Sequence, residues 1–592
     1  MPETGYQECG LNPKWLRGEN IMSLPEALCR GVKTNPQKTA IDYILKFHPV
    51  KIGKIVRFNL AIGKKISYEE LGESSRRFSG LFGSFLEQAN FSETVAIFSL
   101  NCPQFWSAYF GAHLAGAIPA LISLATIAKE LRAKKPIEEI QITEEIRSQI
   151  LDARPKIIVA MDFLWPILSQ IKDELGGAVI ILTRLSDSLP FYWRAAYKKA
   201  AVKDGRWIEK PQGALMLRDI LPNFSVKRWE EIKFPPKEQV AHLIYTGGTT
   251  GTPKGAMTSH ANIISNLLQC RERLDQYIDE GDSVFGAMPF FHSYGLIIAL
   301  MSLLNIRGPL IFSPIFESKQ TAYILKKRRV RIFGGINRMF KAFLAVPALG
   351  NLNYLKLCIS GAGKLDPNIK DAFEKKTGAR ITEGYGLTEA SPVVSLTLPS
   401  ENKPGTIGRP LLGTDLKIVD IETRKEVGFG EVGEILISGP QVMKGYYKKP
   451  EETAKVLVDG WLRTGDTAHR DESGFLYFVG REKEMSKING ENVFWLEVER
   501  HFLTGEAIDQ KCAVIGVPRP GYEDEQILVV FVVLKKGKTT EDLKELIRLA
   551  NNKNWLIKRV VPVSEEVFGE WEDAIGKVQK KKVRKYYEEQ LN

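Results

Sequence analysis

The chain of 592 residues is 44% hydrophobic and 26% charged, and its formal net charge is +12. Since a domain typically takes roughly 100–200 residues and the hydrophobic content suffices for buried cores, we expect several globular domains. The basic charge leaves polyanions, acidic lipids and phosphorylated small molecules open as partners, whereas six cysteines without a close pair argue against a zinc knuckle or a redox pair.

The N-terminal segment has no apolar core between a basic start and a cleavage site, so we expect no secretory signal and a cytoplasmic protein. The longest apolar run covers residues 110–128 and has about the length that spans a bilayer, on the usual rule of ~20 residues. It contains His113 and Pro119 and is rich in Gly and Ala, so we interpret it as a buried helix followed by a strand.

Short apolar runs alternate with helical patterns over the first two thirds of the chain. These runs occupy residues 94–100, 156–161, 178–182, 240–246 and 354–361. Strands that alternate with helices in this way are typical of α/β layers built on largely parallel sheets. The sequence therefore predicts an α/β fold.

After about residue 405 the pattern changes to short strands and Gly turns, as in TDLKIVD, GEILISG and GFLYFVG. We predict a large N-terminal domain over residues 1–480, with α/β subdomains to about 404 and a small β-rich subdomain over about 405–480. Residues 481–592 are predicted to form a small C-terminal α+β domain. The stretch GFGEVG, residues 428–433, matches a dinucleotide-binding pattern, but a strand follows it where a helix is required, so β-turn glycines explain it better.

The stretch YTGGTTGTPKG, residues 245–255, lies between the apolar run VAHLI and the helix-like segment HANIISNLLQ. Glycines let backbone amides approach a ligand, and Thr hydroxyls and a Lys ammonium add donors, which suits a polyphosphate. It is not a Walker loop, because Lys254 is preceded by Pro253 and followed by Gly255. The candidate binding residues are Thr246, Gly247, Gly248, Thr249, Thr250, Gly251 and Lys254.

This loop and the motifs after it resemble those of the AMP-forming ligases, a family that contains acyl-CoA and aryl-CoA synthetases, luciferases and peptide-synthetase adenylation domains. The motifs follow in the family's order across roughly residues 60–585. The resemblance implies that the loop, with Lys254 as a catalytic cation, binds the β- and γ-phosphates of ATP. In MPFFHSYGL, residues 288–296, it places His292 beside the carboxylate and the thiol path.

Two further motifs resemble the family's adenylate-binding segments. In ISGAGKLDP, residues 359–367, the positions that would line the adenine and acyl pockets are Gly361, Ala362 and Gly363. In EGYGLTEASP, residues 383–392, the positions that match the family signature are Tyr385, Gly386, Thr388 and Glu389. By this resemblance Tyr385 faces adenine, Thr388 binds the α-phosphate and Glu389 is the Mg²⁺ ligand.

The C-terminal third carries the remaining motifs. In DGWLRTGD, residues 459–466, the resemblance assigns Asp466 to the ribose hydroxyls. In GREKEMSKINGENV, residues 480–493, it places Arg481 near the ribose and phosphate, Glu484 at an interdomain hinge where Asp is more usual, and Gly490 in the pantetheine tunnel. In AIGKVQKKKVRK, residues 574–585, Lys577 resembles the catalytic lysine of a mobile C-terminal domain, which would bring it to the site for the first step.

The implied reaction uses ATP, Mg²⁺ and coenzyme A: a carboxylate forms acyl-AMP and pyrophosphate, and the thiol then displaces AMP. A long-chain fatty acid is the expected acid, because TGGTTG and the preceding segment that opens with SLPFYWRAAYKKAAVKDG most resemble bacterial long-chain fatty acyl-CoA ligases. An aryl-CoA or acyl-carrier-protein ligase is a close alternative. A non-catalytic basic membrane or nucleic-acid binder and a P-loop ATPase are distant ones, and no nucleic-acid partner is expected.

Residues 191–203 could also contact a membrane. If the segment is helical, one stripe carries Trp193, Ala196, Tyr197 and Ala200, and basic residues flank it at Arg194, Lys198, Lys199 and Lys203. Such a pattern suits a helix lying on the anionic inner face of a membrane. The alternative is a surface helix that packs this stripe on its own domain.

Overall fold

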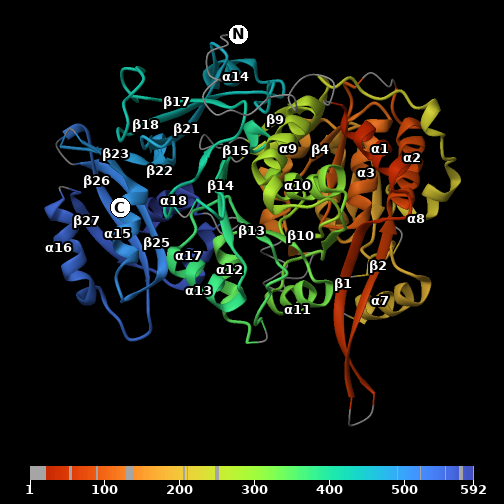
Figure 1. Ribbon diagram of the computed structural model, residues 1–592, viewed down its shortest axis with the longest axis horizontal. Coiled ribbons are helices and arrows are strands. Elements are labelled where there is room, and N and C mark those ends of the chain that lie inside the picture. Colours follow the sequence, from red (N-terminus) through yellow and green to blue (C-terminus); the bar gives the residue numbers. More distant parts are fainter. Residues whose placement is uncertain are drawn as a thin grey trace. The chain divides into compact units, whose positions relative to one another are not determined.

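The structure is a computed structural model (Figure 1). It describes residues 22–52, 56–87, 91–127, 139–203, 207–209, 211–246, 253–347, 349–401, 403–489, 491–519, 522–553, 555–572 and 578–590. The chain forms two compact units. Unit 1 takes in the described residues of Met1–Pro404, Pro410–Asp415 and Ser438–Leu457, and unit 2 takes in those of Gly405–Arg409, Leu416–Ile437 and Val458–Asn592.

The first sheet of unit 1 has eight strands. Their order is β19 (Gly445–Tyr446), β9 (Lys254–Ser259), β8 (Val240–Thr246), β4 (Ile118–Leu121), β3 (Thr94–Phe98), β5 (Ile157–Met161), β6 (Val179–Thr183) and β7 (Leu215–Met216). From β8 to β7 all neighbours are parallel, whereas β9 is antiparallel to both β8 and β19. The parallel strands are apolar runs buried along almost their whole length, as expected for strands covered on both faces.

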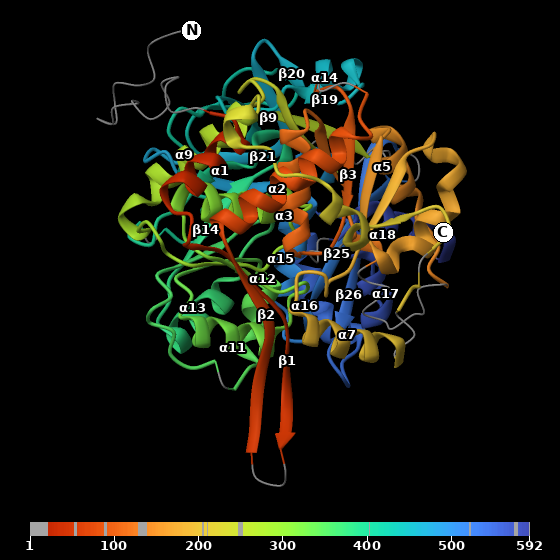
Figure 2. The same ribbon diagram turned by 90° about the vertical axis from the view of Figure 1, so that its right-hand side faces the viewer.

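The second sheet of unit 1 has nine strands and is also mainly parallel. Their order is β16 (Arg409–Pro410), β15 (Val393–Leu396), β14 (Ile381–Gly386), β13 (Leu357–Ser360), β12 (Ile332–Gly335), β10 (Val284–Gly286), β11 (Leu310–Phe312), β1 (Thr39–Ile52) and β2 (Val56–Ser67). Strands β1 and β2 form a long antiparallel hairpin whose far end extends away from the rest of the sheet (Figure 2). The predicted α/β class with parallel sheets is confirmed.

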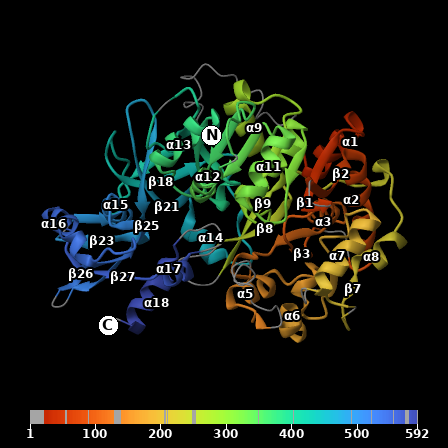
Figure 3. The same cartoon turned by 90° about the horizontal axis from the view of Figure 1, so that it is seen from below.

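Helices cover both sheets of unit 1. They are α1 (Leu24–Thr34), α2 (Tyr68–Gly83), α3 (Pro103–Leu114), α5 (Glu144–Ala153), α6 (Trp165–Leu168), α7 (Phe191–Lys203), α8 (Leu217–Ile220), α9 (His260–Leu274), α10 (Ser293–Leu300), α11 (Ser318–Arg328), α12 (Asn337–Leu344), α13 (Pro367–Thr377) and α14 (Pro450–Val456). Helices α1, α2 and α3 lie side by side in all three views (Figures 1, 2 and 3).

The apolar run at 110–128 is divided as predicted, because α3 ends at Leu114 and strand β4 begins at Ile118. Every residue of α3 is buried. No helix within the described part of the chain is long and apolar enough to cross a membrane.

Unit 2 contains a small five-stranded sheet and an α+β region. The sheet is formed by β17 (Asp415–Val419), β18 (Gly433–Ser438), β20 (Leu457–Val458), β21 (Trp461–Arg470) and β22 (Leu476–Arg481). The α+β region contains β23 (Met485–Ile488), β24 (Glu491–Phe494), α15 (Trp495–Leu503), β25 (Ile508–Arg519), β26 (Tyr522–Leu534), α16 (Lys544–Asn552), β27 (Ile557–Pro562), α17 (Glu565–Trp571) and α18 (Lys580–Gln590), drawn in blue in Figure 3. The predicted β-rich stretch, 405–480, contributes residues to both units. The boundary at 480 and the mobility of 481–592 stay predictions.

Three buried histidines meet where α3, β8 and α9 pack together. They are His113, His242 and His260, none more than 3% exposed. The Nε2 atom of His113 donates to the carbonyl of Ala241 at 2.7 Å, and His242 Nδ1 lies 3.0 Å from the hydroxyl of Tyr109. Burial lowers the pKa of His113 to about 4 and that of His242 to about 3, and it also lowers the pKa of His260. The three rings are therefore neutral at pH 7.

We predict that these histidines make unit 1 sensitive to acid. Between pH 6.5, the ordinary histidine pKa, and the lowered values, the unfolded chain binds protons that the folded chain excludes. The free energy of unfolding therefore decreases as the pH is lowered through this range, by up to about 1.4 kcal/mol per pH unit for each histidine. Thermal unfolding of wild type and His113→Gln between pH 7.5 and 5 measures this dependence.

The His113→Gln variant should lose less of its thermal midpoint on acidification than wild type, even if it starts lower at pH 7.5. The two proteins are compared by the slope of their thermal midpoint against pH. Burial raises the pKa of Asp162 to about 6, so this group stabilises the folded state on acidification, and it does so equally in both proteins. Equal slopes for the two proteins would contradict the prediction.

Candidate active site

The Gly- and Thr-rich loop connects β8 to β9. Thr246 and Lys254 are paired across the two strands, and the Thr246 hydroxyl donates to the Lys254 carbonyl at 3.5 Å. The loop residues Gly247, Gly248, Thr249, Thr250 and Gly251 lie outside the described residues. The segment HANIISNLLQ forms the start of α9, as expected, and strand β9 lies between the loop and this helix. The two strands that the loop connects are antiparallel neighbours in the sheet.

Lys254 lies in a small charged cluster at the start of β9. Its ammonium group forms an ion pair with Glu452 on α14 and lies 5.3 Å from the ring centroid of Tyr446 on β19. The Tyr446 hydroxyl donates to Glu389 Oε1 at 2.9 Å. The cation of the loop motif and the carboxylate of the signature motif are thus linked through one aromatic side chain.

Glu389 and Thr388 belong to η9 (Thr388–Ala390), a short 3₁₀ turn after β14. The hydroxyl of Thr388 lies 3.2 Å from that of Ser293, the first residue of α10. His292 precedes Ser293 and caps α10, since its Nδ1 accepts a hydrogen bond from the Tyr294 amide at 3.2 Å. The structure therefore brings the predicted residues His292, Thr388 and Glu389 to one place through neighbouring residues.

Tyr294 also connects α10 with the Gly-Ala-Gly turn. Its hydroxyl donates to the carbonyls of Ile359 at 2.8 Å and Gly335 at 3.1 Å. A Cβ at Gly361 would lie 3.3 Å from the Tyr294 ring, so glycine allows this turn to pack closely against it. The next residue, Ala362, has a positive φ of 59°. Gly361, Ala362 and Gly363 thus form a sharp turn after β13.

Tyr385 and Gly386 end strand β14. Tyr385 is largely buried, with 9% of its surface exposed. A Cβ at Gly386 would lie 2.1 Å from the Pro392 carbonyl oxygen, so only glycine fits at this crossing of β14 and the following segment. The glycine of the signature motif is explained by backbone packing.

In unit 2, Asp466 and Arg481 face each other on β21 and β22. Their register pairs the two residues directly, and Arg481 Nε lies 3.1 Å from Asp466 Oδ1. Glu484 follows in a short 3₁₀ turn. Gly490 and Lys577 lie outside the described residues, although Val578, next to Lys577, pairs with Glu572.

The residues of unit 1 fit a magnesium ion held mainly by a substrate. The described residues include no group of three or more His, Cys, Asp or Glu side chains that could hold a metal by themselves. Mg²⁺ is commonly bound by one or two carboxylates together with substrate phosphates and water. Glu389, which follows Thr388 in η9, supplies that kind of oxygen donor.

Sequence reasoning missed Ser293, Tyr446 and Glu452. Ser293 adjoins the predicted His292, so its position in the motif could have indicated it. Tyr446 and Glu452 lie in MKGYYKKPEET, which has no ligand-binding composition of its own. Their place at the site depends on the pairing of β19 with β9, which one sequence does not reveal.

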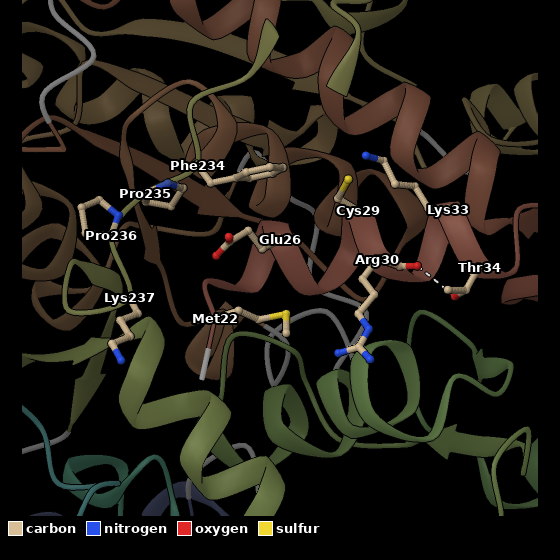
Figure 4. Close-up of a pocket in the computed structure, with 10 residues that line it drawn as sticks. All are labelled: Met22, Glu26, Cys29, Arg30, Lys33, Thr34, Phe234, Pro235, Pro236 and Lys237. Carbon is tan, nitrogen blue, oxygen red and sulfur yellow. Dashed lines mark hydrogen bonds between the residues drawn. The ribbon is translucent and has the colours of Figure 1, made fainter. Parts of the chain in front are cut away.

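Unit 1 also has a groove that is lined by other residues. It has a volume of about 650 Å³ and runs between α1 and the segment before β8 (Figure 4). Figure 4 shows its lining, which is Met22, Glu26, Cys29, Arg30, Lys33, Thr34, Phe234, Pro235, Pro236 and Lys237. None of these residues belongs to a predicted motif, so the groove is not the site that the motifs indicate.

Comparison with known proteins identifies relatives along most of the chain. The family described as AMP-binding enzyme matches residues 30–447. The long-chain-fatty-acid–CoA ligase of Bacillus subtilis is 33% identical over 530 residues, covering 88% of this chain and 90% of its own. The ligase of the same name from Haemophilus influenzae is 30% identical and covers 81% and 84%. A probable 4-coumarate–CoA ligase 1 from Dictyostelium discoideum is 32% identical over 58% and 62%.

Solved structures share the fold. ATP-bound MatB from Rhodopseudomonas palustris superposes with a TM-score of 0.77 at 25% identity, covering 96% of this chain and all of its own. The anthranilate CoA ligase AuaEII in complex with anthranoyl-AMP gives 0.74 at 21% identity, covering 96% and 98%. These findings confirm the resemblance, its catalytic interpretation and the use of ATP, Mg²⁺ and coenzyme A. They set aside the non-catalytic binder and the P-loop ATPase.

We predict that Glu389→Gln raises the Mg²⁺ concentration needed for half-maximal binding of ATP by roughly tenfold, because a neutral amide replaces a charged oxygen ligand. Titration calorimetry with ATP at graded Mg²⁺ concentrations measures the effect. Asp371→Asn, which removes an exposed carboxylate on α13, is the matched control. The same Mg²⁺ requirement in Glu389→Gln and wild type would rule out this role.

Proposed function

Because the chain belongs to the family of AMP-binding enzymes, we propose that it joins a carboxylic acid to coenzyme A at the expense of ATP. In the first step the carboxylate attacks the α-phosphate and pyrophosphate leaves. In the second, the thiol of coenzyme A attacks the acyl carbon and AMP leaves. The observation that best supports this proposal is the link from Lys254 through Tyr446 to Glu389, which joins a cation and a metal-binding carboxylate.

The first step brings anions together, so the site has to offset their repulsion. Mg²⁺, when bound, supplies positive charge to the phosphates. Lys254 and the loop hydroxyls hold the β- and γ-phosphates, and Thr388 donates to the α-phosphate. Lys577 serves this first step. No side chain forms a covalent bond with the acyl group, and catalysis rests on positioning and charge.

In this proposal the adenine and the ribose of the nucleoside are bound by different motifs. Tyr385 and the turn at 361–363 accommodate adenine, and His292 lies beside the acyl carboxylate. Asp466 accepts hydrogen bonds from the ribose hydroxyls, and Arg481, which is ion-paired with it, orients that carboxylate. Residues 481–592 move as a domain about Glu484 between the steps, bringing the Gly490 region to the site for the second.

A long-chain fatty acid is the proposed acyl substrate. The relatives whose names carry this substrate are 30–33% identical over 81–88% of the chain, whereas the coumarate-type relative matches 58% of it. The match to the fatty-acid ligases extends beyond residues 30–447, the region that the family as a whole shares. This wider similarity supports a fatty acid over an aromatic acid as the substrate. Coenzyme A, rather than a carrier protein, is the proposed thiol for the same reason.

Carboxylate-dependent exchange of labelled pyrophosphate into ATP tests both parts of the proposal. Fatty acids of 8 to 18 carbons should support exchange with kcat/KM rising roughly tenfold or more along the series, since each buried CH₂ contributes about 0.8 kcal/mol. Benzoate and coumarate should support little exchange. If an aromatic acid is preferred, the proposed fatty-acid substrate is wrong. If no acid supports exchange, the proposed ligase activity is wrong.

We further propose a cytoplasmic enzyme that touches the membrane through α7. The exposed side chains of this helix differ from the expected stripe: Trp193 and Tyr197 are half-buried, whereas Phe191 is 76% and Tyr192 54% exposed. Adjacent exposed aromatic rings at the start of a helix that contains no acidic residue suit an anionic bilayer surface. Lipid-dissolved acids would then reach the enzyme without crossing water.

Phe191→Ser, Tyr192→Ser should lower co-sedimentation with anionic vesicles at least roughly threefold, because it removes the two exposed rings that would enter the interface. Ile315→Ser, which changes another exposed apolar side chain of unit 1, should sediment like wild type. Binding should also weaken with salt. Equal sedimentation of all three proteins, or none, would reject the membrane contact.

A further inference from the structure

The segment from Met443 to Thr453 is attached to both phosphate-binding motifs by its backbone. The Met443 amide donates to the carbonyl of Glu389 at 2.8 Å, and the Tyr447 amide donates to that of Gly255, beside Lys254, at 2.8 Å. The Thr453 hydroxyl accepts from the Tyr446 amide at 2.9 Å and closes the segment on itself. Side chains of this segment are therefore held at fixed positions relative to Lys254 and Glu389.

Tyr446 uses both its hydroxyl and its ring at this place. The hydroxyl donates to Glu389, and the ring lies beside the Lys254 ammonium. Tyr446 is 7% exposed, and burial, reinforced by the Glu389 carboxylate, raises its pKa. The phenol hydroxyl is thus a hydrogen-bond donor held against that carboxylate.

Glu452 is the charged partner of Lys254. It pairs with Lys254 and with Lys455, and the hydrogen bond from Lys254 is the main reason that its pKa is lowered to about 2. The carboxylate is therefore ionised throughout the physiological range. A phosphate that approaches Lys254 meets an ammonium group already shared with an anion.

We propose that Tyr446 and Glu452 are positioning residues for the triphosphate site: Tyr446 orients the Glu389 carboxylate, and Glu452 holds the Lys254 ammonium until phosphate replaces it. The inference rests on the proposed function, because it takes Lys254 and Glu389 as the groups that meet ATP and its metal. It assigns opposite effects to the two side chains. Tyr446 strengthens metal-dependent binding, whereas Glu452 competes with the nucleotide.

The proposed role of Tyr446 is tested with Tyr446→Phe, which keeps the ring and removes the hydroxyl. Calorimetric titration with ATP should show affinity reduced roughly tenfold in Mg²⁺ and unchanged in EDTA, as for loss of a partner that orients a metal ligand. The matched control is Tyr447→Phe, the neighbouring residue, which should match wild type in both conditions. Equal losses with and without Mg²⁺, or no loss, would overturn the role of Tyr446.

The proposed role of Glu452 is tested with Glu452→Gln, which keeps a hydrogen-bond acceptor for Lys254 and removes the negative charge. In EDTA the affinity for ATP should rise roughly 2- to 5-fold, the range of a partly exposed ion pair. Glu451→Gln, an exposed carboxylate on the same helix, is the control and should change little. An unchanged or weaker affinity in Glu452→Gln would overturn the competition.

The proposed function and the roles of Tyr446 and Glu452 are contradicted by different results. If the wild type binds ATP but supports no pyrophosphate exchange, the proposed function is wrong, and the ATP-binding tests of the variants still apply. Wild type that binds no ATP would remove both. If the wild type exchanges pyrophosphate but the Tyr446 and Glu452 variants bind ATP like their controls, only the roles proposed for Tyr446 and Glu452 are wrong. Thermal midpoints of the four variants, compared with wild type, show whether each is folded.

Discussion

The pairing of β9 with β19 brings together the chemistry of unit 1. Tyr446 and Ala256 lie opposite each other in this register, although about 190 residues separate them in the chain. The backbone hydrogen bonds fix the ring of Tyr446 beside Lys254, and the Met443 amide extends the same segment to Glu389. Without this two-residue strand, the loop cation and the signature carboxylate would be held only by their own motifs.

The charges around Lys254 are balanced before any nucleotide is present. Glu452 is shared by Lys254 and Lys455, and Glu389 receives a hydrogen bond from a neutral phenol. A triphosphate site with uncompensated cations would repel itself and bind any anion. Local carboxylates avoid this at the expense of some affinity for phosphate, and they favour a ligand that carries its own metal ion.

The parallel strands could be predicted from the sequence because both of their faces are buried and the signal is a continuous apolar run. The run at 240–246 coincides with β8, and that at 178–182 is offset by one residue from Val179–Thr183. Strand β9 was missed because KGAMTS shows neither a continuous apolar run nor strict alternation. The segment 191–203, considered as a possible helix, is helical, but periodicity alone did not reveal that Phe191 and Tyr192 are its strongly exposed aromatic residues.

The hydrogen bonds of His292 and Ser293 argue against a covalent acyl-enzyme. A serine nucleophile needs a basic nitrogen to take its proton. The Nδ1 atom of His292 already accepts from the Tyr294 amide, so the neutral ring carries its proton on Nε2 and acts there as a donor. The Ser293 hydroxyl lies next to that of Thr388 instead. The adjacent His292 and Ser293 are therefore arranged as hydrogen-bonding groups, and this suits a reaction in which the substrate carboxylate itself is the nucleophile.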